Sequence, residues 1–172
     1  MSFQFTSYNP KKLKLNKRSL INAIEFHSDK DRANREDALL SQAISYAING
    51  NTKLYTLKDT SSTLKGILGI VALSASEVLI DNTKKPIILI DLLFVNNKYR
   101  SEEYEHLDNS KISTLLIEYA VTKAQEVKEL VGISYIALYP DGGKDNIRLV
   151  DFYKSIGFDF ITNKHEWMYI KL

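Results

Sequence analysis

The amino-acid sequence predicts an α/β fold built on one mixed β-sheet, and three consecutive segments carry this prediction. Residues 87–95 form an unbroken apolar run, which is typical of a central strand buried on both faces. Residues 110–129 follow with an apolar stripe at helical spacing, and residues 133–139 return to β-branched and aromatic residues. A buried strand, a helix and a second buried strand in this order indicate a parallel crossover within the sheet.

The other elements follow from the same two hydrophobic periods. The segments predicted before the crossover are a strand at 3–7, helices at 17–28 and 34–49, and strands at 53–57 and 64–80, with a polar loop at 81–86. Ser110 is a plausible N-cap for the helix of the crossover. After the crossover, residues 146–155 form a short helix that Gly157 ends, and the alternating residues 167–172 form a half-buried strand.

Length and composition exclude several classes of protein. The 172 residues fit one domain over residues 1–172, and 44% hydrophobic with 26% charged residues is typical of a globular chain. The chain has no cysteine, which excludes disulfides, Cys–zinc sites and a thiol nucleophile. No apolar run reaches the roughly 20 residues of a membrane span, and the N-terminus lacks the order of a signal peptide. We therefore expect a cytoplasmic protein without a membrane partner.

Charge gives a weaker indication of partners. The formal net charge is only +2, which by itself does not point to nucleic acid. Among the first 20 residues, however, all the charged side chains are basic: Lys11, Lys12, Lys14, Lys17 and Arg18. Such a run is usually a solvated segment, and it also fits a strip that holds an anionic partner. The three histidines are scattered along the chain, so we expect no metal site.

One segment carries a recognisable motif. Asn146 stands seven residues before Tyr153, and Gly157 and Phe158 follow Tyr153 after three further residues. This spacing resembles the C-terminal motif of the Gcn5-related N-acetyltransferase (GNAT) superfamily. Leu149 stands where that motif usually has alanine.

Neighbouring segments agree with this resemblance. IDLLFVNNKYR at residues 90–100 resembles the fourth strand of the superfamily, residues 111–127 resemble the helix after it, and the ending EWMYIKL resembles its last strand. The resemblance covers roughly residues 52–172. It implies a mixed, mostly antiparallel central sheet flanked by about four helices, and acetyl-CoA as the co-substrate.

The resemblance also implies roles for particular residues. Tyr153 would protonate the leaving thiolate, Asn146 would bind the cofactor arm, and Leu93 and Val95 would offer backbone groups to the pantetheine. Tyr153 also fits a core aromatic residue, and Asn146 also fits a helix N-cap. Asp91, the only acid in the central strand, is the candidate base because burial can raise the pKa of a carboxyl group. It equally fits a residue that faces away or anchors a neighbour.

The loop expected to bind the pyrophosphate departs from the family pattern, which is Q/R-x-x-G-x-G/A. An acidic insert at residues 101–110 follows Arg100, and Lys111 and Ser113 take the glycine positions. In one interpretation the insert loops outward and helix amides still hold the phosphates; in the other the cofactor site has been lost. The first interpretation assigns cofactor binding to Arg100, Ser110, Lys111, Ile112 and Ser113.

Three functions fit these observations. The leading one is direct transfer of an acetyl group from acetyl-CoA to a primary amine in a ternary complex, with a small-molecule or macromolecular acceptor. In the second, KKPIILIDLLFV at residues 84–95 resembles toxin-type acetyltransferases that modify aminoacyl-tRNA, although the small net charge does not favour nucleic acid. The third is a non-catalytic module of the same fold that serves binding or homodimerisation, which the degenerate loop supports.

Overall fold

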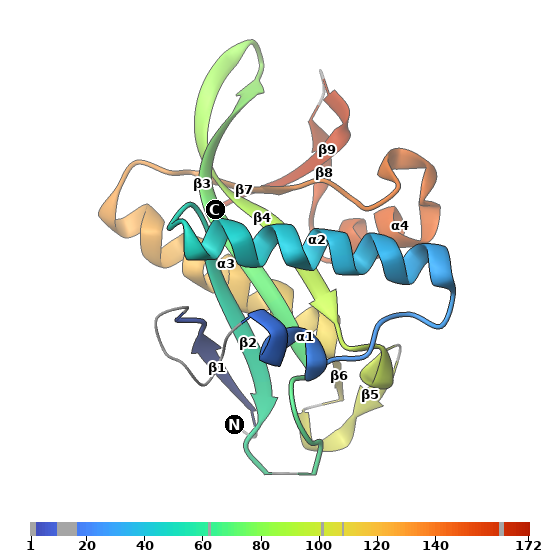
Figure 1. Ribbon diagram of the computed structural model, residues 1–172. Helices are drawn as coiled ribbons and strands as arrows, with labels where there is room; N and C mark the ends of the chain where they lie inside the picture. Colours follow the sequence, from blue (N-terminus) through green and yellow to red (C-terminus); the bar gives the residue numbers. More distant parts are fainter. Residues whose placement is uncertain (1–2, 10–16, 62, 101, 108, 162–163) are drawn as a thin grey trace. The chain divides into compact units, whose positions relative to one another are not determined.

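The computed structural model describes residues 3–9, 17–61, 63–100, 102–107, 109–161 and 164–172 (Figure 1). Its helices are α1 (Lys17–Asn22), α2 (Lys30–Ile48), α3 (Ile112–Leu130) and α4 (Ile147–Ser155). Its strands are β1 (Phe3–Ser7), β2 (Lys53–Asp59), β3 (Gly69–Ile80), β4 (Thr83–Val95), β5 (Glu103–Tyr104), β6 (Ser110–Lys111), β7 (Tyr135–Leu138), β8 (Asp159–Ile161) and β9 (Lys164–Lys171). Among the described residues, no helix is both long and apolar enough to cross a bilayer.

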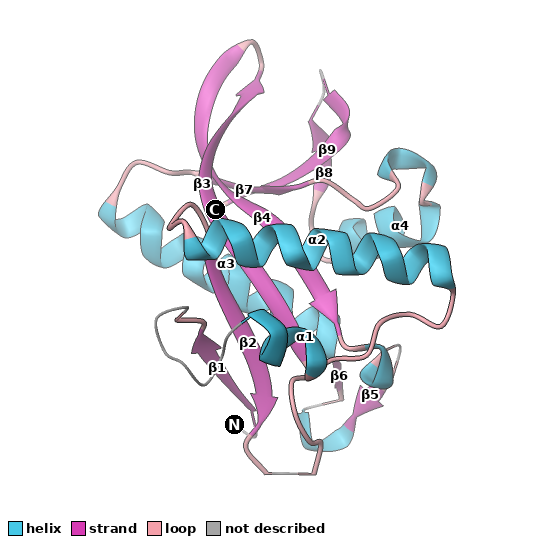
Figure 2. Cartoon of the chain, viewed as in Figure 1, coloured by secondary structure: helices cyan, strands magenta, loops and turns pink. Residues whose placement is uncertain are grey.

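The strands confirm the mixed sheet. Seven of them are hydrogen-bonded in the order β1-β2-β3-β4-β7-β9-β8, and β5 and β6 form a separate two-stranded ribbon (Figure 2). β4 and β7 pair in parallel, with Ile87 opposite Tyr135 and Ile90 opposite Leu138, so the predicted crossover through α3 is present. The pairs β1–β2, β2–β3, β7–β9 and β8–β9 are antiparallel.

The chain divides into two compact units. One comprises residues 1–73 and 92–119, and the other comprises residues 74–91 and 120–172. Of the basic residues near the N-terminus, Lys11, Lys12 and Lys14 lie outside the described residues, whereas Lys17 and Arg18 are exposed on α1. The role predicted for this basic strip stays a prediction.

The core of the first unit explains where α2 lies. Asp29 caps this helix by accepting a hydrogen bond from the Arg32 N–H (2.9 Å). The buried side of α2, including Leu40 and Ile44, belongs to one hydrophobic cluster with Ile70 of β3 and Phe94 of β4. Burying such side chains is the main favourable term in folding, and it orders α2.

Close packing in the same unit requires a glycine at the start of β3. A Cβ on Gly69 would lie 2.8 Å from Leu116 Cδ1 of α3 and 3.0 Å from the Phe94 carbonyl oxygen. The next turn of α3 also contacts the sheet: the Tyr119 ring stacks on Phe5 of β1 with a centroid distance of 3.8 Å. These contacts place the first half of α3 against the sheet.

The second unit has a core of its own. Val78 and Ile80 of β3, Ile87 of β4 and Ala137 of β7 are buried together with Ile161 of β8. Partly buried side chains of β4, β7 and β9 pack against them: Leu89, Tyr135, Trp167 and Tyr169.

Several boundaries differ from the sequence prediction, and local backbone chemistry explains why. β4 begins at Thr83, because Asp81 and Asn82 both adopt positive φ (49° and 59°) and close a two-residue hairpin turn. Residues 83–86, predicted as loop, are therefore strand. β3 begins only at Gly69; Gly66 (φ 87°) lies in the loop before it.

The helices also differ at their ends. α1 stops at Asn22, and α2 begins at Lys30 rather than residue 34, because Asp29 supplies the cap. Ser110 does not act as the predicted N-cap of α3: it belongs to β6, and the helix begins at Ile112.

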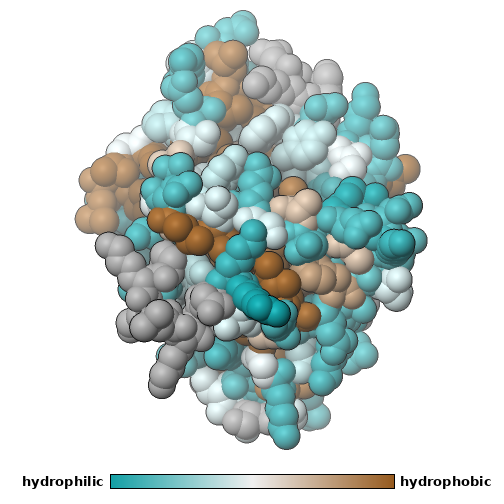
Figure 3. All heavy atoms as spheres, in the orientation of Figure 1, coloured by the Kyte–Doolittle hydropathy of each residue, from teal (hydrophilic) through white to brown (hydrophobic). Residues whose placement is uncertain are grey.

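The surface seen in Figure 3 is largely hydrophilic to neutral, with separate smaller hydrophobic areas.

Candidate functional site

Asn146 both begins α4 and fixes the loop before it. Its Oδ1 accepts a hydrogen bond from the Leu149 N–H (3.4 Å), and its Nδ2 donates to the Asp141 carbonyl oxygen (2.9 Å). The side chain thus satisfies one of the N–H groups that a helix leaves unpaired at its start. The N-cap interpretation of Asn146 is correct, and its role toward a cofactor stays a prediction.

The Gly157-Phe158 end of the motif is a helix C-cap. The Gly157 N–H donates to the Lys154 carbonyl (3.0 Å), and the Phe158 N–H donates to the Tyr153 carbonyl (3.0 Å). This pair of bonds is the Schellman arrangement, which needs a residue at positive φ; Gly157 has φ 98°. Because the cap includes the Tyr153 carbonyl, the spacing from Tyr153 to Gly157 fixes the tyrosine within the last turns of α4.

Tyr153 lies in an apolar environment and keeps a usable hydroxyl group. Its ring contacts Phe158 edge-on (5.8 Å between centroids) and Phe152 at a tilt (5.5 Å). Burial, with a smaller contribution from Asp141, raises the pKa of Tyr153 to about 12. The phenol is therefore neutral at physiological pH and can donate a proton or a hydrogen bond.

The Tyr153 hydroxyl has no hydrogen-bond partner among the described residues. Within the same part of the chain, each fully buried side-chain nitrogen or oxygen does have a partner. The residue as a whole is 6% exposed. The predicted role of Tyr153 as a proton donor stays a prediction.

Asp91, Leu93 and Val95 alternate with buried residues along the end of β4, and all three are partly exposed. Asp91 Oδ1 accepts a hydrogen bond from the Ser74 hydroxyl (3.0 Å), so the carboxylate does anchor a neighbour. The parallel ladder with β7 ends at the pair Ile90–Leu138, and Leu93 and Val95 lie beyond it. Their proposed contacts to a pantetheine arm stay predictions.

Arg100 is held by contacts within its own unit. Its Nη1 lies 2.7 Å from Glu36 Oε1 of α2, its Nε donates to the Val95 carbonyl oxygen (3.0 Å), and its guanidinium lies over the Phe94 ring (5.5 Å). Glu36 also accepts from the His27 N–H (3.0 Å) and from Arg32 Nε (3.0 Å). The guanidinium thus ties α2 to the end of β4.

These contacts also set the charge state of Glu36. Burial alone would raise the pKa of its carboxyl group, but the hydrogen bond and charge of Arg100 and the His27 N–H bond outweigh burial. The pKa of Glu36 is therefore lowered, and the carboxylate stays ionised opposite Arg100. Sequence reasoning missed Glu36, because it stands 64 residues before Arg100 and no motif joins them.

The acidic insert folds as a small hairpin. Tyr104 pairs with Ser110 and Glu103 with Lys111, and Leu107 at the tip is fully buried. Glu102, Glu103 and Glu105 are exposed, while Ser101 and Asp108 lie outside the described residues. The Tyr104 hydroxyl donates to Glu102 (3.3 Å), and burial followed by the Glu102 charge raises the pKa of Tyr104 to about 12.

The first turn of α3 follows this hairpin directly. α3 begins at Ile112, whose side chain is buried at 1% exposure, so the backbone of its first turn is firmly placed. The N–H groups of a first helical turn have no partner within the helix and attract anions. Lys111 is half exposed, but its Nζ lies 3.7 Å from Glu103 Oε1, which offsets part of its charge.

The predicted site residues fall into two groups, one in each unit. Asp91, Asn146 and Tyr153 belong to the unit of residues 74–91 and 120–172. Apart from Asn146, the residues predicted to bind the cofactor belong to the other unit: Leu93, Val95, Arg100, Ser110, Lys111, Ile112 and Ser113. Among the described residues, no cluster of histidine, aspartate and glutamate that could hold a metal is found.

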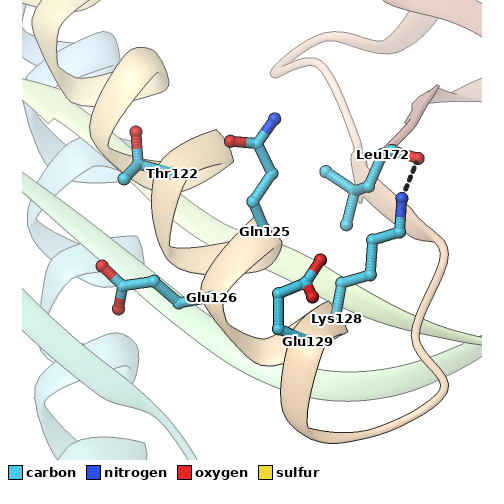
Figure 4. Close-up of a pocket in the computed structure, with 6 residues that line it drawn as sticks. All are labelled: Thr122, Gln125, Glu126, Lys128, Glu129 and Leu172. Atoms are coloured by element: carbon cyan, nitrogen blue, oxygen red, sulfur yellow. Dashed lines mark hydrogen bonds between the residues drawn. The ribbon is translucent and has the colours of Figure 1, made fainter.

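A hollow of about 420 Å³ lies elsewhere in the second unit, along the last turns of α3 (Figure 4). It is lined mostly by polar and charged side chains, and Lys128 Nζ there donates to the Leu172 carbonyl oxygen (2.8 Å). None of the predicted site residues lines this hollow.

The sheet order, the parallel β4–α3–β7 crossover and the capped Asn146–Phe158 segment form the GNAT-like α/β fold that the sequence predicts. The chain is similar in fold to a Tyr→Phe variant of the AtaT toxin bound to the C-terminus of the antitoxin AtaR, with TM-score 0.69 and 14% identity over 99% of this chain and 94% of that one. AtaT complexed with acetyl-methionyl-tRNAfMet gives TM-score 0.69 and 15% identity over 98% and 94%. The KacTA–DNA complex gives 0.64 and 14% over 98% and 93%. No protein-family model and no curated protein matches the chain.

Proposed function

We propose that this protein is an N-acetyltransferase that moves the acetyl group of acetyl-CoA directly to an amine. The observation that carries this proposal is Tyr153: a neutral phenol, held by the cap of α4, with a hydroxyl that lacks a partner among the described residues. The amine nitrogen attacks the thioester carbonyl and a C–N bond forms. The C–S bond breaks, and Tyr153 donates a hydrogen bond or proton to the departing sulfur.

The remaining groups would position the two substrates. The first-turn amides of α3 at Ile112 and Ser113, together with Ser110 and Lys111, would receive the pyrophosphate. The end of β4 at Leu93 and Val95 would receive the pantetheine, and Asn146 is also proposed to bind the cofactor arm. Arg100 would act by holding the Val95 carbonyl rather than by binding phosphate, because its guanidinium already contacts Glu36.

Asp91 is the proposed base. An acceptor amine is protonated in water and must lose a proton before it can attack. A carboxylate at the carboxyl end of the parallel ladder lies where open α/β sheets commonly bind ligands. Ser74 would then orient the carboxylate through the 3.0 Å hydrogen bond.

For the acceptor we propose the amine of an aminoacyl-tRNA. AtaT, which has the same fold, is complexed with acetyl-methionyl-tRNAfMet, and another AtaT structure holds an antitoxin and acetyl-CoA. We extend both properties to this chain: an aminoacyl-tRNA as substrate and a protein partner that restrains the enzyme. The non-catalytic alternative has less support, because the chain keeps Tyr153 and both caps of α4, Asn146 at its start and Gly157 at its end.

Two measurements test the proposal. Acetyl-CoA at 100 times its dissociation constant should stabilise the protein by about 2.7 kcal/mol in thermal unfolding. Acetyl-labelled acetyl-CoA should transfer its label to aminoacyl-tRNA, with deacylated tRNA and free amino acids as controls. Absence of any acetyl-CoA binding would contradict the enzymatic proposal. Transfer to free amines but not to aminoacyl-tRNA would contradict only the acceptor.

A further inference from the structure

One face of the sheet in the unit of residues 74–91 and 120–172 is built by strand residues in register. In one row, Ile87 of β4 pairs with Tyr135 of β7, and Tyr135 pairs with Lys171 of β9 on its other side. Two residues further on, Ala137 of β7 lies between Leu89 and Tyr169 in the same way. Because strand side chains alternate, the odd-numbered residues of all three strands share this face.

Four aromatic rings lie along this face in two pairs. Tyr135 and Tyr169 have centroids 5.8 Å apart, and Tyr139 and Trp167 have centroids 5.9 Å apart at 70°. Tyr139 is 47% exposed, a high value for an aromatic residue that is packed on another ring. A Cβ on Gly143 would lie 3.2 Å from the Tyr139 hydroxyl, so the following loop supports this ring from one side.

The charges near this face differ from one end to the other. Asp91 and Tyr139 each directly follow the last pair of the parallel ladder, Ile90–Leu138, so they mark its carboxyl end. At the opposite end, Lys171 is exposed beside Tyr135. Lys85, two residues before Ile87 and therefore on the same face, is partly exposed. The face thus runs from a carboxylate, past the exposed Tyr139 and three rings that are partly buried against the core, to two cationic side chains.

We propose that this aromatic face binds the single-stranded 3′ end of an aminoacylated RNA. Such an end presents three groups in matching order: a free amine for Asp91, a terminal base for Tyr139 and Trp167, and phosphates for Lys171 and Lys85. Unpaired bases stack on aromatic side chains whatever their identity, and lysines hold the backbone electrostatically. The inference rests on the proposed function and assigns to it the surface that recognises the acceptor.

The sequence supplies an internal probe for this proposal. Trp167 is the only tryptophan of the chain, so the intrinsic tryptophan fluorescence reports on this face alone. The full-length protein is titrated with a tRNA acceptor minihelix that ends in a single-stranded 3′ overhang, and separately with the same stem cut blunt. We expect saturable quenching with the overhang and none with the blunt stem. Equal responses to both RNAs, or no response to either, would overturn the proposal.

Variants separate stacking from charge. Tyr139→Ala should weaken binding of the overhang minihelix about 5- to 150-fold, the effect of losing one base–aromatic stack, whereas Tyr139→Phe should bind like wild type. Lys171→Gln should lower the slope of log K against log[salt] by about 0.7. Tyr46→Ala is the matched control: Tyr46 is 42% exposed but lies on α2.

The transfer assay distinguishes this inference from the proposed function. If the protein acetylates aminoacyl-tRNA, and Tyr139→Ala leaves its KM for that substrate unchanged, the surface assignment is wrong and the function stands. If no transfer occurs but the overhang quenches Trp167, the surface assignment stands and the acetyltransferase proposal is wrong. Because Tyr139 is 47% exposed, its replacement should leave the fold intact, which circular dichroism and thermal unfolding check.

Discussion

Replacing Tyr153 by phenylalanine is the sharpest test of the proposed chemistry, because it removes one oxygen atom and keeps the ring. The contacts with Phe152 and Phe158 depend on the ring and should persist. The hydroxyl has no hydrogen-bond partner among the described residues, so removing it strands no donor or acceptor there. We therefore expect the free energy of unfolding to change by less than about 1 kcal/mol.

The rate should respond quite differently. General acid catalysis contributes about 10²–10⁴-fold, so Tyr153→Phe should lower kcat by that factor. At about 1.36 kcal/mol per tenfold change, this is roughly 2.7–5.4 kcal/mol of lost transition-state stabilisation. Acetyl-CoA affinity should stay nearly constant, because the hydroxyl would act on the sulfur only as the C–S bond breaks.

The pH dependence adds a second criterion. The pKa of Tyr153 is about 12, so the phenol stays protonated across the neutral range and should not produce a basic limb of the kcat profile below about pH 11. A phenol this weak is also a poor donor to a free thiolate, whose reference pKa is near 8.5. We therefore expect Tyr153 to stabilise the negative charge that develops on sulfur through a hydrogen bond rather than through complete proton transfer.

The assay is single-turnover transfer from labelled acetyl-CoA by wild type, Tyr153→Phe and a control, with binding and thermal unfolding measured on the same preparations. Tyr46→Phe is the control, because its hydroxyl accepts only from Gln42 on α2 in the described contacts. If Tyr153→Phe keeps full turnover and merely unfolds earlier, Tyr153 is a core aromatic residue and the reasoning is refuted.

Three further outcomes are expected. Glu36→Gln should destabilise the protein by about 1–3 kcal/mol in denaturant unfolding; because the folded-state pKa of Glu36 is lowered, this difference is full above about pH 4.3 and shrinks as pH falls through that lowered pKa. Joint replacement of Glu102, Glu103 and Glu105 by glutamine should tighten acetyl-CoA binding in calorimetry, by at most about 1 kcal/mol per charge and less at high salt; an unchanged or weaker affinity would argue against phosphates near the hairpin. Gly157→Ala should cost about 1 kcal/mol or more in thermal unfolding, since φ is 98° there, and Gly50→Ala, also at positive φ but with open space around it, is the comparison.

The part of the site that the sequence predicts best is the part held by local chemistry. Asn146 caps the helix that follows it, and Gly157 and Phe158 close the same helix by bonds to Lys154 and Tyr153. Each of these bonds spans only a few residues, so their spacing is visible in the sequence as a motif. The same reason explains why the β4–α3–β7 crossover was predictable: each element has a clear period of its own.

Short hairpin elements were not predictable from hydrophobic periodicity. Two-residue strands such as β5 and β6 are too short to show a period, so the insert could be read only as an acidic loop. The sequence predicts a polar loop that extends beyond the turn at Asp81–Asn82, because the next residues, Lys84 and Lys85, are polar. The structure places both lysines in β4. At this exposed end of the hairpin, Lys84 Nζ of β4 lies 2.6 Å from Glu77 Oε1 of β3. The polarity of the two residues does not by itself show that they pair across two strands.

The end of β4 shows how the proposed cofactor loop, which lacks glycines, is held in place at its start. Asn96, 4% exposed, donates to the Ile67 carbonyl (2.8 Å) and accepts from the Glu25 N–H (3.2 Å), while Arg100 four residues later joins Val95 to Glu36. Both side chains bind segments far away in sequence and fix the backbone from Val95 to Arg100. A backbone fixed in this way needs less rearrangement on binding, which lowers the free-energy cost of ligand association. Rigidity of the strand end can therefore offset the conformational freedom that glycines supply in the family's usual loop.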